Sequence, residues 1–249
     1  MQLVVNGVLS FAERIHPEGK IPVVILPGWG QDSKHWLSFT KRLPLGNEYF
    51  LLDLPGFGQT QHLPVGAGVP EYVEWLHTWL EKADVKNPVL FGHSFGGQVA
   101  VAYAAKYPKA IRHLILLSPS ALRNKSTKVR FIEQLYRHFG WIKKLTPSGL
   151  FQKLRPYLAS DDYHQASPEQ KAVLSKIVQQ DQRSRLSKIE VPTDIIWGDK
   201  DGEIPYGGKI LAEEIPNTRL FILYGADHSP QLTAPDKLRP VVTEILEQL

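Results

Sequence analysis

The chain has 249 residues, of which 43% are hydrophobic and 22% are charged, as is typical of a soluble globular protein. No apolar run approaches 18 residues, and the first residues lack the pattern of a secretory signal, so neither a membrane span nor export is expected. Because the chain has no cysteine, the sequence excludes a disulfide framework, a thiol nucleophile and a thiolate metal site, and a cytoplasmic location is expected. The net charge is only +4, so no nucleic-acid partner is expected.

The predicted elements alternate between strands and helices. Asn6-Gly7 separates two apolar-rich runs and predicts a hairpin, because both residues tolerate positive φ. Short apolar runs predict strands at Val23–Leu26, Tyr49–Asp53, Val89–Phe91, Leu114–Leu117, Asp194–Trp197 and Arg219–Leu223. Helices are predicted at about Ser33–Leu43, Pro70–Lys82, Phe95–Tyr107, Gly207–Glu214 and Pro235–Leu249. This order predicts an α/β fold with a mostly parallel, twisted sheet flanked by helices and an antiparallel edge.

The alternation stops after Ser118 and resumes at Val191. In between, apolar residues recur at helical spacing, and Ser167 opens a Ser-x-x-Gln capping box. We therefore expect a helical cap at 119–187, inserted into a core of 1–118 and 188–249. Residues 121–188 carry 14 Lys and Arg but only 5 Asp and Glu. This excess is either a solvated helical surface or an attraction for an anionic substrate, an acidic acyl carrier or a lipid surface.

The most informative motif is Gly92-His93-Ser94-Phe95-Gly96, a G-x-S-x-G pentapeptide between a predicted strand and a predicted helix. In this context the serine lies on a tight turn that exposes its Oγ, and small glycines let the strand and helix approach each other. The helix N-terminus also favours negative charge near the serine. The alternative is a glycine-rich turn with an unreactive serine. We interpret Ser94 as a candidate nucleophile.

A serine hydroxyl needs a neutral imidazole to accept its proton, and the imidazole needs a carboxylate on its other nitrogen. In hydrolases with this type of turn, the acid and then the base follow the serine along the chain. His228 follows the last predicted strand and is favoured as the base. Asp199 and Asp201 both follow the strand before it, and Asp201 is favoured as the acid because Gly202 comes directly after it.

A tetrahedral intermediate requires two N–H donors, one of them from the residue after the nucleophile. That residue is Phe95. The second donor is expected from Trp29, which lies between Gly28 and Gly30 after an early strand. A tight turn that packs the indole is the simpler interpretation of these glycines, and both interpretations are compatible.

These motifs resemble the α/β-hydrolase superfamily over nearly the whole chain. The resemblance rests on Pro27–Gly30, Asp53–Gly58, Gly92–Gly97, Gly198–Asp201 and Asp227–Pro230. It implies a capped sheet domain with Ser94 as nucleophile, Asp201 as acid, His228 as base, and backbone donors from Trp29 and Phe95. It also implies a structural role for the loop from Asp53 to Gly58. Pro27 departs from the family, which usually has histidine there.

Within this superfamily the chain looks like small carboxylesterases that cleave pimeloyl methyl ester on acyl carrier protein. We predict a cofactor-free and metal-free serine carboxylesterase that acts on a small-molecule ester through an acyl-enzyme. Two alternatives remain open: a carbon–carbon bond hydrolase of the meta-cleavage type, which usually has tryptophan where this chain has Ser229, and a non-catalytic receptor. Besides Gly28, the substrate pocket is expected to include five residues of the cap, each of which alternatively belongs to the packed core: Phe131, Leu135, Phe139, Trp141 and Leu150.

Overall fold

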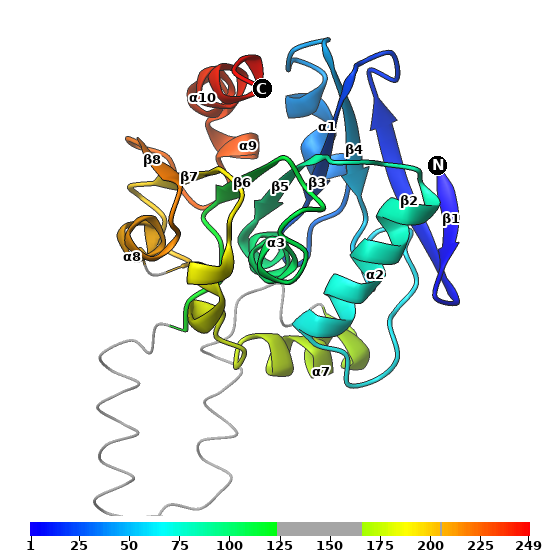
Figure 1. Ribbon diagram of the computed structural model, residues 1–249. Coiled ribbons are helices and arrows are strands. Elements are labelled where there is room, and N and C mark those ends of the chain that lie inside the picture. The colour runs from blue at the N-terminus through cyan, green and yellow to red at the C-terminus, as the bar shows by residue number, and fades with distance from the viewer. Residues whose placement is uncertain (124–165, 205) are drawn as a thin grey trace, which may run out of the picture.

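The computed structural model describes residues 1–123, 166–204 and 206–249 (Figure 1). Its centre is an eight-stranded sheet with the strand order β1-β2-β4-β3-β5-β6-β7-β8. The strands are β1 (Gln2–Val5), β2 (Val8–Ile15), β3 (Ile21–Leu26), β4 (Asn47–Leu52), β5 (Val89–His93), β6 (His113–Leu117), β7 (Thr193–Gly198) and β8 (Thr218–Leu223). The strands from β3 to β8 run parallel, whereas β1 and β2 pair antiparallel, so the predicted sheet is confirmed.

The hairpin between β1 and β2 forms at the predicted dipeptide. Asn6 and Gly7 have φ angles of 51° and 81°, and Val5 pairs with Val8 across the turn. Two successive positive φ angles match the twist of an antiparallel pair. The antiparallel edge of the sheet therefore follows from local sequence.

Helices cover both faces of the sheet, as Figure 1 shows. α2, α3 and α8 pack on one face, and α1 and α10 pack on the other. Neighbouring strand residues alternate between the two cores, so that Val24 faces α2 and α3 while Val23 and Ile25 face α1 and α10. The helices are α1 (Lys34–Thr40), α2 (Val69–Lys82), α3 (Ser94–Lys106), α7 (Pro168–Ile177), α8 (Gly208–Glu214), α9 (Pro230–Thr233) and α10 (Pro235–Glu247).

A polar cluster, formed by the buried His113 and Asp194 and the exposed Arg219, joins the beginnings of β6, β7 and β8. His113 Nε2 lies 2.7 Å from Asp194 Oδ2, and the Arg219 guanidinium donates two hydrogen bonds to the same carboxylate. Burial opposes ionisation of Asp194, but the hydrogen bonds from His113 and Arg219 outweigh it and hold the Asp194 pKa below its ordinary value. The cluster lies at the edge of the sheet opposite the carboxyl ends of the parallel strands, so it stabilises the fold away from the expected site.

The described part of the expected cap includes α7, which begins at the predicted capping box. The Ser167 hydroxyl accepts a hydrogen bond from the Gln170 N–H, and the Gln170 side chain accepts one from the Ser167 N–H. Gln98 of α3 ties the end of α7 to the sheet domain through hydrogen bonds to the carbonyls of Ile177 and Gln180. Residues 124–165 lie outside the described residues, so the extent of the cap remains a prediction.

Candidate active site

The turn from β5 into α3 places Ser94 in the left-handed region, with φ at 49°. A non-glycine residue there is strained and requires close support from its surroundings. That support comes from two flanking glycines. A Cβ on Gly92 would lie 2.7 Å from the Gly96 carbonyl oxygen, and a Cβ on Gly96 would lie 2.1 Å from the Leu26 carbonyl oxygen. The glycines of the motif thus allow strand and helix to meet tightly beneath the serine.

The loop after β3 is bound directly to this turn. The Gly96 N–H donates a 3.0 Å hydrogen bond to the Pro27 carbonyl oxygen, and a Cβ on Gly28 would lie 3.3 Å from the Ser94 Cβ. The Trp29 N–H donates no hydrogen bond to any described residue. The Phe95 N–H is among the first four of α3, which have no intrahelical partner. Both predicted donors therefore lie close to Ser94.

The Trp29 side chain packs into an aromatic cluster. Its ring centroid lies 4.8 Å from that of Phe57 and 5.9 Å from that of Phe95, both edge to face, and Phe95 makes the same kind of contact with Tyr72. The indole is thus packed while the Trp29 N–H has no hydrogen-bond partner among the described residues, so the two interpretations of this turn are compatible in the structure.

The carboxylate and the imidazole meet after β7 and β8. His228 Nδ1 lies 2.8 Å from Asp201 Oδ2, and both side chains are almost fully buried. Asp201 Oδ1 accepts hydrogen bonds of 3.0 Å from the N–H groups of Glu203 and Ile204. Burial opposes ionisation of Asp201, but the hydrogen bonds from His228 and Ile204 outweigh it, so the Asp201 pKa lies below its ordinary value.

Asp199, the competing acid, makes a different contact. Its carboxylate accepts a hydrogen bond from the Gly225 N–H, and its own N–H donates to the Leu223 carbonyl oxygen. It therefore stabilises the loops that follow β7 and β8. Of the two aspartates, the structure brings only Asp201 to His228.

The loop that begins at Asp53 is held by its own carboxylate, which is buried. Asp53 Oδ1 accepts a hydrogen bond from the Ser33 N–H, and Oδ2 accepts one from the Gln59 N–H, each 2.7 Å long. The bond from Ser33 joins the loop after β4 to the start of α1, and the bond from Gln59 links two parts of the loop itself. This arrangement agrees with the structural role implied for residues 53–58.

A cavity of about 980 Å³ is lined by all the predicted site residues that the structure describes except Asp201. Asp201 contacts His228 but does not line the cavity. Polar and apolar groups share its wall, and α7 contributes Leu174 and Ile177. Of the residues predicted for the site, those that line this cavity are Gly28, Trp29, Ser94, Phe95 and His228. The five predicted pocket residues of the cap lie outside the described residues: Phe131, Leu135, Phe139, Trp141 and Leu150.

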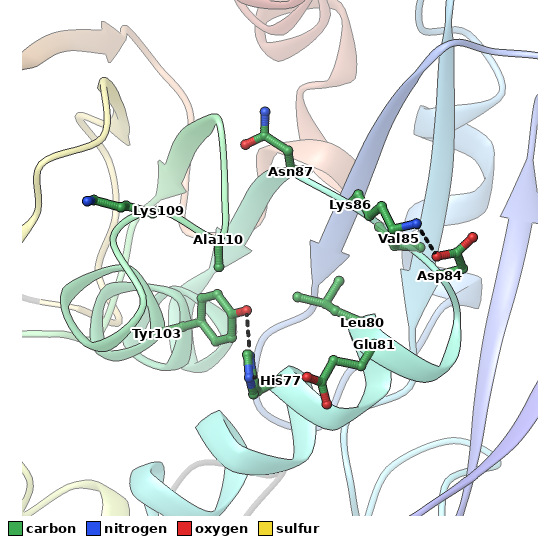
Figure 2. Close-up of a pocket in the computed structure, with 10 residues that line it drawn as sticks. All are labelled: His77, Leu80, Glu81, Asp84, Val85, Lys86, Asn87, Tyr103, Lys109 and Ala110. Atoms are coloured by element: carbon green, nitrogen blue, oxygen red, sulfur yellow. Dashed lines mark hydrogen bonds and ion pairs between the residues drawn. The ribbon is translucent and has the colours of Figure 1, made fainter.

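A second cavity, of about 360 Å³, lies between α2, α3 and the loop before β5 (Figure 2). In Figure 2 the Tyr103 hydroxyl points to the His77 ring, and Lys86 pairs with Asp84. The loop precedes β5, whereas Ser94 follows it, so this cavity is at the opposite edge of the sheet. Its polar groups are largely paired with one another, and we assign it no chemistry.

Three residues that line the larger cavity had not been assigned a role from the sequence. His93, inside the pentapeptide, is buried, and its Nε2 lies 2.8 Å from the His228 carbonyl oxygen. The Gln31 side chain lies 3.3 Å from His93 Nδ1. Glu203, whose side chain is 71% exposed, has a carboxylate oxygen 3.9 Å from His228 Nε2. Among the described residues, no group of three His, Asp or Glu side chains is arranged to hold a metal ion.

Comparisons with known proteins agree with this fold. Monoacylglycerol lipase ABHD6 from Rattus norvegicus is 29% identical over 272 residues, which cover 95% of this chain and 78% of the relative. Among solved structures, a bacterial membrane phospholipase A superposes with a TM-score of 0.80 at 22% identity, covering all of this chain and 85% of its own. A meta-cleavage product hydrolase from Pseudomonas fluorescens IP01 superposes with a TM-score of 0.74 at 17% identity, covering 100% and 97%.

The family model described as alpha/beta hydrolase fold matches residues 21–161, more than half of the chain. The matched range begins at β3 and includes the Ser94 turn. The sheet order and the strained serine between β5 and α3 are consistent with this match. The chain therefore belongs to the α/β-hydrolase fold family.

Proposed function

We propose that this protein is a serine hydrolase of carboxylic esters. The observation that carries the proposal is the 2.8 Å contact of His228 with Asp201, because His228 lines the same cavity as the strained Ser94. A relative that covers most of the chain carries the name monoacylglycerol lipase, which favours neutral lipid esters among the possible substrates.

In the proposed reaction, the Ser94 Oγ attacks the ester carbonyl carbon while His228 Nε2 takes the hydroxyl proton. Asp201 holds the proton on Nδ1 and stabilises the imidazolium. The N–H groups of Trp29 and Phe95 bind the oxyanion, each contributing roughly 3 kcal/mol to the transition state. His228 then gives its proton to the departing alcohol, which leaves an acyl ester on Ser94. Water, deprotonated by His228, attacks this ester and releases the acid.

Active-site labelling tests the proposal directly. Incubation with a fluorophosphonate is expected to add one phosphonyl group, located by peptide mass spectrometry on Ser94, because the same activated hydroxyl attacks phosphorus. A panel of p-nitrophenyl esters, 1-acylglycerols and a meta-cleavage ring-fission product then identifies the substrate class. Labelling at another residue, or none, contradicts the proposal. Hydrolysis of the ring-fission product alone favours the carbon–carbon bond hydrolase, and ligand binding without turnover favours the receptor.

Glu203 is expected to disfavour anionic ligands, because its carboxylate lies 3.9 Å from His228 Nε2, where the acid product forms. Two like charges about 4 Å apart in water repel each other by about 1 kcal/mol, a factor of roughly five in binding. The variant Glu203→Gln is expected to lower the inhibition constant of butyrate roughly fivefold. The measurement is competitive inhibition at low salt.

Glu190→Gln is the matched control, because Glu190 is exposed and does not line the cavity. Its inhibition constant is expected to match that of the unaltered protein. If the unaltered protein, Glu203→Gln and Glu190→Gln had equal inhibition constants, Glu203 would have no electrostatic effect on the binding of anionic ligands.

Residues 119–187 are proposed as the cap over this site, since the described part of this segment supplies Leu174 and Ile177 to the cavity. An acidic acyl carrier as partner of the basic segment stays a prediction, as does the cytoplasmic location. No helix among the described residues has the length and hydropathy needed to cross a bilayer.

A further inference from the structure

Three loops of the site meet at the ring of His93. The ring is buried at the end of β5, and its centroid lies 4.9 Å from that of His228. One ring nitrogen, Nε2, lies 2.8 Å from the His228 carbonyl oxygen, on the loop after β8. The other, Nδ1, lies 3.3 Å from the side-chain oxygen of Gln31, on the loop after β3. The residue next to the nucleophile is thus in contact with both other loops.

The proton on His93 can be placed by its partners. A carbonyl oxygen only accepts, so Nε2 must carry a hydrogen and donate it to the His228 carbonyl. Burial and the neighbouring His228 lower the pKa of His93 to about 3, so the ring carries a single proton at neutral pH. Nδ1 is therefore an acceptor and needs a donor.

In the structure the Gln31 amide oxygen faces Nδ1 and accepts a 3.3 Å hydrogen bond from the Gln231 amide, so Gln31 supplies the donor when its amide oxygen and nitrogen exchange places. An amide can present either its oxygen or its nitrogen, and the surrounding hydrogen bonds decide which one. After this exchange the Gln31 oxygen replaces the nitrogen that now lies 3.3 Å from the Ser229 hydroxyl, and it can accept a hydrogen bond from that hydroxyl. The Gln231 amide then turns its buried oxygen, which has no partner among the described residues, toward the Gln31 nitrogen. Ser229 directly follows His228. Gln31 therefore links the loop of the proposed oxyanion donors to the loop of the proposed base.

We propose that His93 and Gln31 form a buried polar brace that positions His228 relative to Ser94 and the oxyanion loop. Neither residue exchanges a proton with the substrate. Both are positioning residues that act through the His228 backbone. The proposal rests on the proposed ester hydrolysis, in which a displacement of the imidazole would slow proton transfer without weakening substrate binding.

Two variants of His93 separate the hydrogen bond from the bulk of the ring. His93→Gln carries an amide nitrogen near the position of Nε2 and can still donate to the His228 carbonyl, whereas His93→Leu cannot. His113→Leu is the control, because His113 is a buried histidine paired with Asp194 at the opposite edge of the sheet. That variant is expected to lower Tm and leave kcat unchanged.

For His93→Leu we expect kcat to fall roughly fivefold to tenfold, the effect of about one hydrogen bond, with KM changed less than twofold. The rate of fluorophosphonate labelling should fall by the same factor, and His93→Gln should recover most of both rates. The proposal would be overturned if kcat fell in proportion to Tm in both His93→Leu and His113→Leu, or if His93→Gln restored neither rate.

The tautomer gives a test that does not depend on activity. Nitrogen-15 NMR of the imidazole rings is expected to show a neutral His93 with its proton on Nε2, unchanged between pH 5 and 8. A proton on Nδ1, or titration in that range, would also overturn the brace. If the unaltered protein neither hydrolyses esters nor labels at Ser94, the proposed function fails. If it does both, but His93→Leu and His93→Gln have the same kcat and the same labelling rate, only the brace fails.

Discussion

The variant Ser94→Ala is expected to lower kcat for ester hydrolysis by about 10⁶-fold, because it removes the hydroxyl that we propose forms the acyl bond. The serine is held in a strained conformation by the glycines around it, and alanine fits the same space. The folded structure should therefore survive, with an unchanged circular dichroism spectrum and Tm. The measurement is the rate of p-nitrophenyl butyrate hydrolysis at high enzyme concentration.

Ser38→Ala serves as the matched control, because Ser38 lies in α1 and outside the cavity. It should hydrolyse the ester at the rate of the unaltered protein. If Ser94→Ala retained more than a hundredth of the original rate, another group would be the nucleophile.

The variant Asp201→Asn is expected to lower kcat by about 10⁴-fold. An asparagine amide donates to His228 Nδ1, which moves the imidazole proton to Nε2 and leaves no lone pair for the serine proton. The lowered pKa of Asp201 has the sign that this role requires: the carboxylate is ionised at neutral pH and is neutralised only well below its ordinary titration range. The measurement is kcat for the same ester from pH 6 to 9.

Asp199→Asn is a close control, because it makes the same chemical change two residues earlier in the chain. Asp199 accepts from the Gly225 N–H and does not contact His228, so kcat should change little. If Asp199→Asn were the inactive variant, the assignment of the acid would be reversed.

The sheet was predictable from the sequence because its signals are local. Continuous apolar runs mark strands buried on both faces, and the Asn6-Gly7 pair identifies the hairpin at the edge. The proximity of His228 and Asp201 was predictable for a related reason: both follow parallel strands, whose carboxyl ends share one edge of the sheet.

Contacts between side chains of different loops were not predictable in this way. Nothing near Gln31 in the sequence indicates that its amide lies beside His93 and Ser229, which are 62 and 198 residues away. Glu203 is likewise an ordinary loop glutamate until the fold places it beside His228. Such contacts depend on the exact path of each loop, whereas strands and turns depend on residues close together in the chain.

The hydrogen bond from the Gly96 N–H to the Pro27 carbonyl oxygen joins the serine turn to the loop before Trp29. The spacing between the proposed nucleophile and the proposed Trp29 donor is therefore set by a direct backbone contact. His228 arrives on a separate loop, so its distance from the serine depends on other contacts, among them the one between His93 Nε2 and the His228 carbonyl oxygen.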